Sequence, residues 1–181
     1  MSAPAAPIVV LGIGNALLGD DAVGVRVLEA LGHRASHDRT LLPPDTRLVD
    51  GGTLGLDLVA TIDGARAVLL LDAVDVGAAP GEVVHLTGDE IRAAGDRRPG
   101  GRAGGVGELL AMARLMGWFS GPAALVGVQV DRLAFSTRLT PAVEAAVPVA
   151  VEAARRTLLE LDSDVRRSRR PAPAHAMETT P

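Results

Sequence analysis

The residues best suited to chemistry gather in two short segments. The first is Gly12–Asp21, read GIGNALLGDD, which follows an apolar run and ends on two adjacent carboxylates, Asp20 and Asp21. The second is Asp72, directly after the apolar run Ala67–Leu71. A carboxylate at the end of a buried strand needs a partner, because burying it alone is costly, and a metal ion or an arginine could serve. These aspartates are therefore candidates for metal-dependent chemistry.

Each of these features also has a structural alternative. Asp20 and Asp21 could simply favour the start of a helix, where the helix dipole attracts negative charge. Asp72 could accept hydrogen bonds from a neighbouring loop. Gly12-x-Gly14 is also found in the dinucleotide-binding fingerprint, but the position of the third glycine of that pattern is occupied by Leu17. A nucleotide-dependent enzyme is thus a third, weaker hypothesis.

Composition narrows the chemistry further. The chain of 181 residues has no Cys, four His and a formal charge of −4. The absence of Cys excludes disulfides, thiolate zinc sites, iron–sulfur clusters and a cysteine nucleophile, so a metal site would have to use Asp or Glu. All 18 basic residues are arginine, which excludes a P-loop lysine, and the negative charge gives no basic field for nucleic acid. The apolar runs are too short to span a membrane, and we expect a cytoplasmic protein without a membrane partner.

Strand-like and helix-like segments alternate along the chain. We predict strands at 8–13, 46–49, 67–71, 82–86 and 123–130, and helices at 20–31, 54–62, 106–116 and 141–161, with a Gly/Arg loop at 94–105. Gly32 is expected to end the first helix, and Pro148 to kink the last helix or to mark its true start. This alternation predicts an α/β fold, a three-layer sandwich with a mostly parallel twisted sheet and helices on both faces. Ligand sites in such sheets lie beyond the carboxyl ends of the strands, where neighbouring strands would bring Asp72 close to Asp21.

The last residues differ in composition from the rest. Residues 163–181 hold four Arg, one Asp, one Glu and three Pro, a charge of +2, which leaves −6 for residues 1–162. Such a segment cannot bury a core. We therefore predict a single domain over residues 1–162, followed by a disordered Arg/Pro-rich tail.

Several segments, in order, resemble the [NiFe]-hydrogenase maturation endopeptidases. They are VLGIGNALLGDDAVGVRVLEAL at 10–31, DGGT at 50–53, LLDAV at 70–74, PGEVV at 80–84, LVGVQ at 125–129 and LTPAV at 139–143. The resemblance implies an endopeptidase that removes the C-terminal extension of a hydrogenase large-subunit precursor after nickel insertion. It implies that Asp21 and Asp72 are the metal-binding and catalytic residues and that Ni²⁺ arrives with the substrate. Asp50, in the Gly-rich turn, would help to bind that substrate or would have only a role in the turn. The partner would be the large-subunit precursor, and the free protein would be a monomer.

One position departs from the pattern of this family. The family places a third metal ligand, a His, in the loop before the third predicted helix, and counting back from that helix puts Arg102 there. A guanidinium has no lone pair to donate to a metal. Arg102 could instead steady the substrate chain or the developing oxyanion, or it could pair with Asp21 or Asp72 in a non-cleaving relative that binds or checks the large subunit. A third hypothesis is that a loop insertion misleads the count and that His37 lies near Asp21.

Overall fold

The computed structural model describes residues 6–96 and 105–168. Five strands form one sheet in the order β2-β1-β3-β5-β4. All neighbouring pairs are parallel except β4 with β5. The strands are β1 (Ile8–Ile13), β2 (Thr46–Gly52), β3 (Ala67–Val74), β4 (Val83–Thr87) and β5 (Ala123–Gln129). The predicted, mostly parallel α/β sheet is confirmed.

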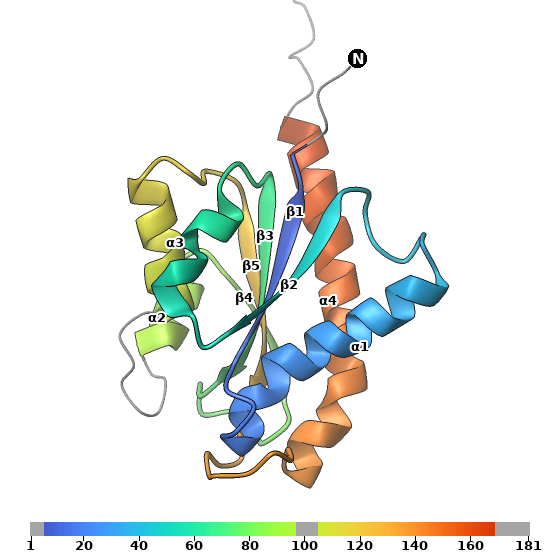
Figure 1. The fold of residues 1–181 in the computed structure, drawn as a ribbon, viewed down its shortest axis with the longest axis vertical. Helices are drawn as coiled ribbons and strands as arrows, with labels where there is room; N and C mark the ends of the chain where they lie inside the picture. Colours follow the sequence, from blue (N-terminus) through green and yellow to red (C-terminus); the bar gives the residue numbers. More distant parts are fainter. Residues whose placement is uncertain (1–5, 97–104, 169–181) are drawn as a thin grey trace, which may run out of the picture.

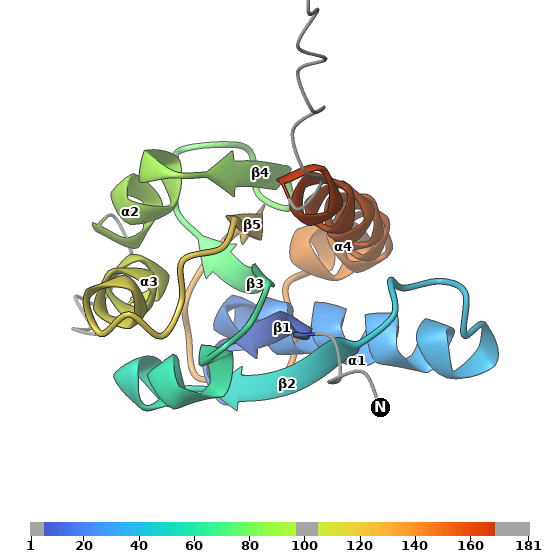
Figure 2. The same ribbon diagram turned by 90° about the horizontal axis from the view of Figure 1, so that it is seen from above.

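Helices cover both faces of this sheet, as Figures 1 and 2 show. Helices α1 (Val23–His37) and α4 (Pro141–Ser168) lie on one face. The other face carries the 3₁₀ segment η2 (Gly55–Ile62) with α2 (Asp89–Asp96) and α3 (Val106–Leu115). Alternate residues of β1 and β3 enter the two cores, so Val10 packs toward α1 and α4 whereas Val9 packs toward α3. Both strands are fully buried, which explains their unbroken apolar runs.

The chain reverses its direction across the sheet at β1. It passes from β1 through α1 to β2 on one side, and then returns to β3 on the other side of β1. In open α/β sheets, such a reversal opens a crevice beyond the carboxyl ends of the two strands. The segment that leaves β1 and the end of β3 therefore meet where a ligand site is expected.

Two expectations about the helices are wrong, the end of the first at Gly32 and Pro148 as the start of the last. Helix α1 does not end at Gly32 but continues to His37, because the Gly32 backbone stays helical instead of taking the left-handed conformation that ends a helix. Helix α4 begins at Pro141 and passes through Pro148, which therefore does not mark its start. Pro148 is exposed, so water can hydrogen-bond to the carbonyl group that loses its amide partner.

The predicted tail boundary is also wrong in part. Residues 163–168 belong to α4, where buried Leu161 and Val165 continue its apolar face and Asp162 binds Arg166 one turn on. Residues 169–181 lie outside the described part of the chain. Nothing in the described ranges is a helix long and apolar enough to cross a membrane.

Helix α2 was not predicted from the sequence, because its first residues follow the end of β4 at Thr87 without a proline or a long turn. A capping signal is nevertheless present in the sequence. Glu90 accepts a hydrogen bond from the backbone N–H of Thr87 at 3.0 Å, which is half of a capping box, and Ile91 and Ala94 form the buried stripe. The predicted loop at 94–105 therefore begins later than expected, after Asp96.

Candidate active site

Asp72 lies on β3 at the level where β1 ends. Leu71 is the register partner of Gly12 in β1, and Asp72 is that of Gly127 in β5. Strand β3 runs to Val74, so Asp72 is an internal strand residue rather than the one after it. It is 3% exposed, and one of its carboxylate oxygens accepts the N–H of Ala73 at 2.8 Å. This buried carboxylate faces the end of the sheet at which the chain reverses its direction.

Glycines bring the start of α1 against the sheet. A Cβ on Gly24 would lie 2.2 Å from the backbone oxygen of Leu71 and 2.4 Å from that of Ile13. A Cβ on Gly12 would lie 2.8 Å from the Cβ of Leu28. Only glycine permits such an approach, and Gly24 stands one helical turn after Asp21. This packing brings Gly24 against Leu71, the residue before Asp72, and the short segment that holds Asp21 contacts the same strand.

Asp21 is held in the short 3₁₀ segment η1 (Gly19–Ala22) between β1 and α1. It is 4% exposed, and its Oδ2 accepts the backbone N–H of Asn15 at 2.9 Å. Gly14 makes this turn possible: its φ is 147°, and a Cβ there would lie 1.8 Å from the backbone oxygen of Asp21. The loop after β1 is thus built around Asp21. Gly14 lets the backbone curve closely around this carboxylate, whereas the glycines of a dinucleotide fingerprint let the backbone approach a phosphate.

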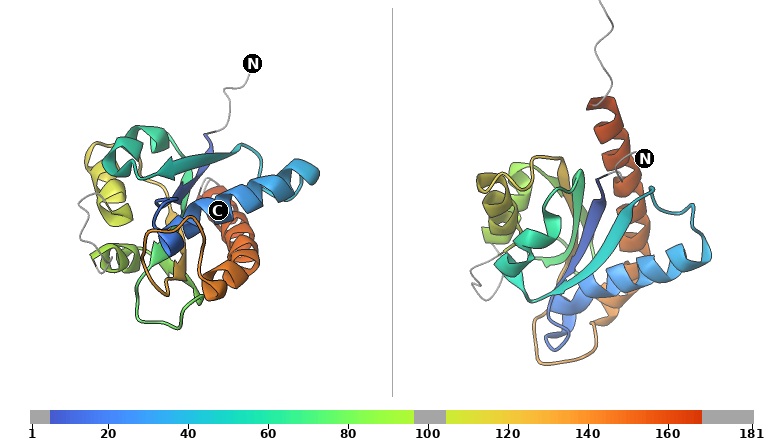
Figure 3. Two further views of the ribbon diagram at one scale, coloured as in Figure 1. Left: turned by 60° about the horizontal axis from the view of Figure 1, so that its bottom comes forward. Right: turned by 45° about the horizontal axis from the view of Figure 1, so that its top comes forward.

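Asp20 plays a different part from Asp21. Its side chain is fully buried and accepts four hydrogen bonds from the loop between β5 and α4. The donors are the backbone N–H groups of Asp131 (3.0 Å), Arg132 (3.2 Å) and Thr140 (2.7 Å), and the Thr140 hydroxyl (3.0 Å). Figure 3 (left) brings this end of the molecule forward and shows that loop passing the start of α1. Asp20 is therefore neither a helix cap nor a free ligand. Its hydrogen bonds link the start of α1 to the distant loop between β5 and α4, and we call this link the Asp20 tie.

Asp50 lies in β2, opposite Gly12 of β1, and not in a turn. Its exposed side chain accepts the N–H of Gly52 at 2.9 Å through Oδ1. The carbonyl of Gly52 in turn accepts the N–H of Gly14 at 2.9 Å, which ties this strand end to the loop holding Asp21. Asp50 therefore lies at the same edge of the sheet as Asp21 and Asp72, with its carboxylate open to a partner.

A small hollow of about 10 Å³ adjoins Asp72. Its other walls include Ala94 of α2 and Gly105 and Val106 at the start of α3. Arg102, predicted in the third ligand position, lies outside the described residues. Within those residues, no group of three or more His, Asp or Glu side chains is arranged to hold a metal ion.

The histidines do not supply a replacement ligand within the described ranges. His37 does not follow α1 but ends it, 16 residues after Asp21, and its ring contacts that of His33 in a tilted arrangement with centroids 4.7 Å apart. A helix of 15 residues is about 22 Å long, which rules out the arrangement with His37 near Asp21. His85 is an exposed residue of β4, and His175 is outside the described residues.

Known proteins are similar to this chain over most of its length. The family model of HycI, hydrogenase maturation protease, matches residues 25–157. The Escherichia coli (strain K12) hydrogenase 2 maturation protease is 36% identical over 146 residues, which cover 80% of this chain and 86% of that protein. The hydrogenase expression/formation protein HupD of Rhodobacter capsulatus is 35% identical over 153 residues, 83% of this chain and 70% of that relative.

The same class appears among solved structures. The hydrogenase maturating endopeptidase HybD from E. coli superposes with a TM-score of 0.72 at 32% identity, covering 87% of this chain and 93% of that one. A solution structure of an endopeptidase from Escherichia coli gives a TM-score of 0.71 at 34% identity, covering 83% of this chain and 93% of that chain. The fold is thus that of a peptidase class. This chain belongs to the hydrogenase maturation protease family.

Proposed function

We propose that this protein is the endopeptidase that removes the C-terminal extension of a [NiFe]-hydrogenase large-subunit precursor once nickel is in place. The observation that carries this proposal is the placement of Asp21 and Asp72. Two carboxylates from segments 51 residues apart are buried at the same reversal point of the sheet, in a chain of the maturation protease family.

The donor set suits a metal brought by the substrate. Two buried carboxylates offer oxygen ligands without completing a coordination sphere, and the described residues supply no third ligand. We propose that Asp21 and Asp72 contact the nickel of the precursor, whose own ligands complete the sphere. Nickel held there could polarise the scissile carbonyl or lower the pKa of a water molecule. Because an unfinished precursor brings no metal, the two aspartates would engage only a finished one.

The remaining predicted residues act on the peptide chain in this proposal. The exposed Asp50 carboxylate would hydrogen-bond to backbone N–H groups of the substrate at the edge of β2. Arg102 would steady the substrate chain or the developing oxyanion, since a guanidinium donates hydrogen bonds but does not bind metal. An Arg102→His variant that gains binding of free nickel would support the alignment of this position with the family's histidine.

The decisive test is cleavage of a nickel-loaded precursor by the purified protein. Asp21→Asn and Asp72→Asn keep the size of each side chain and remove its charge, so cleavage should fall by about 100-fold or more. Their thermal stability should be retained, because an uncharged amide is less costly to bury than a carboxylate. Asp57→Asn, on the exposed part of η2, is the matched control and should cleave normally.

Two results would contradict the proposal. Full cleavage by Asp21→Asn would remove that residue from the reaction. Tight association of the unaltered protein with the nickel-loaded precursor without any cleavage would identify a non-cleaving family member instead. We also propose that the protein works in the cytoplasm and is a monomer when free, which light scattering of the purified protein would check.

A further inference from the structure

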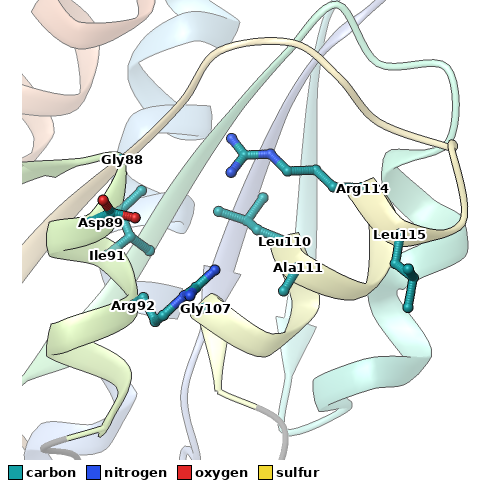
Figure 4. Close-up of a pocket in the computed structure, with 9 residues that line it drawn as sticks. All are labelled: Gly88, Asp89, Ile91, Arg92, Gly107, Leu110, Ala111, Arg114 and Leu115. Carbon is teal, nitrogen blue, oxygen red and sulfur yellow. The ribbon is translucent and has the colours of Figure 1, made fainter.

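A larger cavity lies next to the hollow at Asp72, between α2 and α3. Its volume is about 390 Å³, and Figure 4 shows the residues that line it. The hollow and the cavity are both lined by residues of α2 and α3, but by different ones: Ala94 and Val106 line the hollow, while Ile91, Arg92 and Gly107 line the cavity. Gly107 keeps the two helices close here, because a Cβ on it would lie 3.0 Å from the Cα of Arg92. Consecutive residues of α3, Val106 and Gly107, thus line the hollow at Asp72 and the cavity respectively.

Two cations and an apolar floor characterise this cavity. The side chains of Arg92 from α2 and Arg114 from α3 both extend over the space between the helices (Figure 4). Both are exposed, and neither forms an ion pair with a carboxylate in the described part of the chain. Ile91 and Leu110 form the floor. Asp89 is the one acidic residue of this lining, so the lining has a formal positive charge, although Arg114 also lines a second cavity with Glu160 and Asp164.

The positive charge of this lining is opposite in sign to the net charge of the domain. Residues 1–162 carry a net charge of −6, which on balance repels an anion. Two guanidinium groups that share a cavity also repel one another, and a carboxylate bound between them relieves that repulsion. The cavity therefore favours a ligand with an apolar body and a carboxylate.

The substrate of the proposed reaction carries such a group by necessity. A C-terminal extension ends in a free carboxylate, which is ionised at neutral pH whatever its sequence. From Val106 at the hollow to Arg114 is eight helical residues, or about 12 Å, which roughly four extended peptide residues can span. A chain that leaves the candidate active site thus reaches Arg114 after a few residues, and any longer extension can loop out before its end docks.

We infer that the cavity between α2 and α3 binds the free C-terminal carboxylate of the extension, with Arg92 and Arg114 as the recognition residues. This inference rests on the proposed function and adds to it the part of the substrate that is held away from the scissile bond. It makes the intact end of the precursor a determinant of recognition, in addition to its nickel centre.

Binding of a synthetic peptide tests this inference without any catalysis. The probe is the last twelve residues of the cognate extension, labelled with fluorescein at the N-terminus and followed by fluorescence anisotropy. The free acid should bind, and the C-terminal amide should bind at least about tenfold more weakly, the loss expected from one charge-assisted hydrogen bond. Arg92→Ala and Arg114→Ala should weaken binding of the free acid similarly. Arg156→Ala, an exposed arginine of α4 on the other face of the sheet, should not.

Kinetics on the nickel-loaded precursor supply the second measurement. Arg114→Glu should raise KM about tenfold or more and leave kcat within about twofold, because the contact is made equally before and during the reaction. Equal binding of the acid and the amide, no binding of the acid by the unaltered protein, or equal binding of a peptide of residues 169–181 of this chain would each overturn the inference. If the unaltered protein cleaves its precursor and the arginine variants behave like it, only this inference fails. If the unaltered protein does not cleave, the proposed function fails.

Discussion

Adjacent aspartates in this chain have opposite roles, which their hydrogen bonds reveal. The Asp20 carboxylate accepts four hydrogen bonds from residues 131–140, and this saturates a buried charge. Asp21 accepts a hydrogen bond from the Asn15 N–H within its own loop, and it lies beside the strand that carries Asp72. The hydrogen bonds of Asp20 fix the backbone next to Asp21, the residue that we propose binds the metal.

Asp50 allows a prediction at the level of a single charge. Asp50→Asn keeps an oxygen that can accept the Gly52 N–H and removes only the negative charge. Because the side chain is exposed, stability should change by less than about 0.5 kcal/mol. If Asp50 binds the substrate, KM for the precursor should rise several-fold while kcat changes little. Unaltered kinetics would leave Asp50 with only its local role in shaping the end of β2.

At the scale of elements, the position of α1 determines where η1, which holds Asp21, lies relative to β3. The helix approaches β1 and β3 through Gly24 and Gly12, and this contact brings η1 to the end of β3. Leu17, which stands at the third glycine position of a dinucleotide fingerprint, does not prevent close packing of helix on strand, because Gly24, the second residue of α1, provides it.

A pair of glycines on this one helix tests the idea. Gly24→Ala would place a methyl group 2.2 Å from the Leu71 backbone oxygen, so the helix must retreat. We expect a loss of about 1–3 kcal/mol in the free energy of unfolding, together with a loss of cleavage as Asp21 moves away from Asp72. Gly32→Ala is the control: its Cβ meets only the end of the Leu48 side chain, at 3.2 Å. That variant should gain up to about 1 kcal/mol and cleave normally. Urea denaturation and precursor cleavage measure both effects, and equal behaviour of the two variants would contradict the argument.

At the scale of the whole molecule, a buried ion pair that stabilises the fold lies at the opposite end of the sheet from the candidate active site. An ion pair at 2.6 Å joins Arg66, just before β3, to Asp162 of α4, and both side chains are nearly buried. Arg66 also donates to the carbonyl of Pro44 at 2.7 Å. This group of contacts lies at the amino ends of the strands, opposite the candidate active site. It secures the far half of α4, which the sequence analysis assigned in part to a disordered tail.

Removing one partner of this pair should therefore affect stability alone. Asp162→Ala leaves the Arg66 guanidinium without its carboxylate, and we expect a loss of about 3–5 kcal/mol in the free energy of unfolding. Precursor cleavage well below the melting temperature should be unchanged, because the pair is remote from Asp21 and Asp72. Arg26→Ala, which breaks an exposed pair with Glu29, should cost less than about 1 kcal/mol and is the natural comparison. A strong loss of cleavage in Asp162→Ala at low temperature would show that the two ends of the sheet are coupled.

Strands and helices could be predicted from the sequence wherever the local pattern of apolar residues matches their burial in the structure. The runs at 8–13 and 67–71 are buried on both faces of the sheet, so every residue in them is apolar and the strands are evident. The residue type of Gly32 did not reveal that its backbone stays helical and so does not end α1. The role of Asp20 could not be predicted either, because its donors lie 111 to 120 residues further along the chain. Asp21 and Asp72 could be singled out, because a carboxylate beside an apolar run needs a partner wherever it lies.

The Asp20 tie also has a consequence for the order of events during synthesis. A ribosome releases the chain from its N-terminus, so β1, η1 and β3 emerge before any of the donors to Asp20. Until residues 131–140 have emerged, the Asp20 carboxylate lacks the donors that satisfy its charge, at a place that must become buried. The site is therefore completed only when the last strand and the first turn of α4 have docked. A nascent or truncated chain would hold both aspartates and still lack the rigid backbone needed to act on another protein.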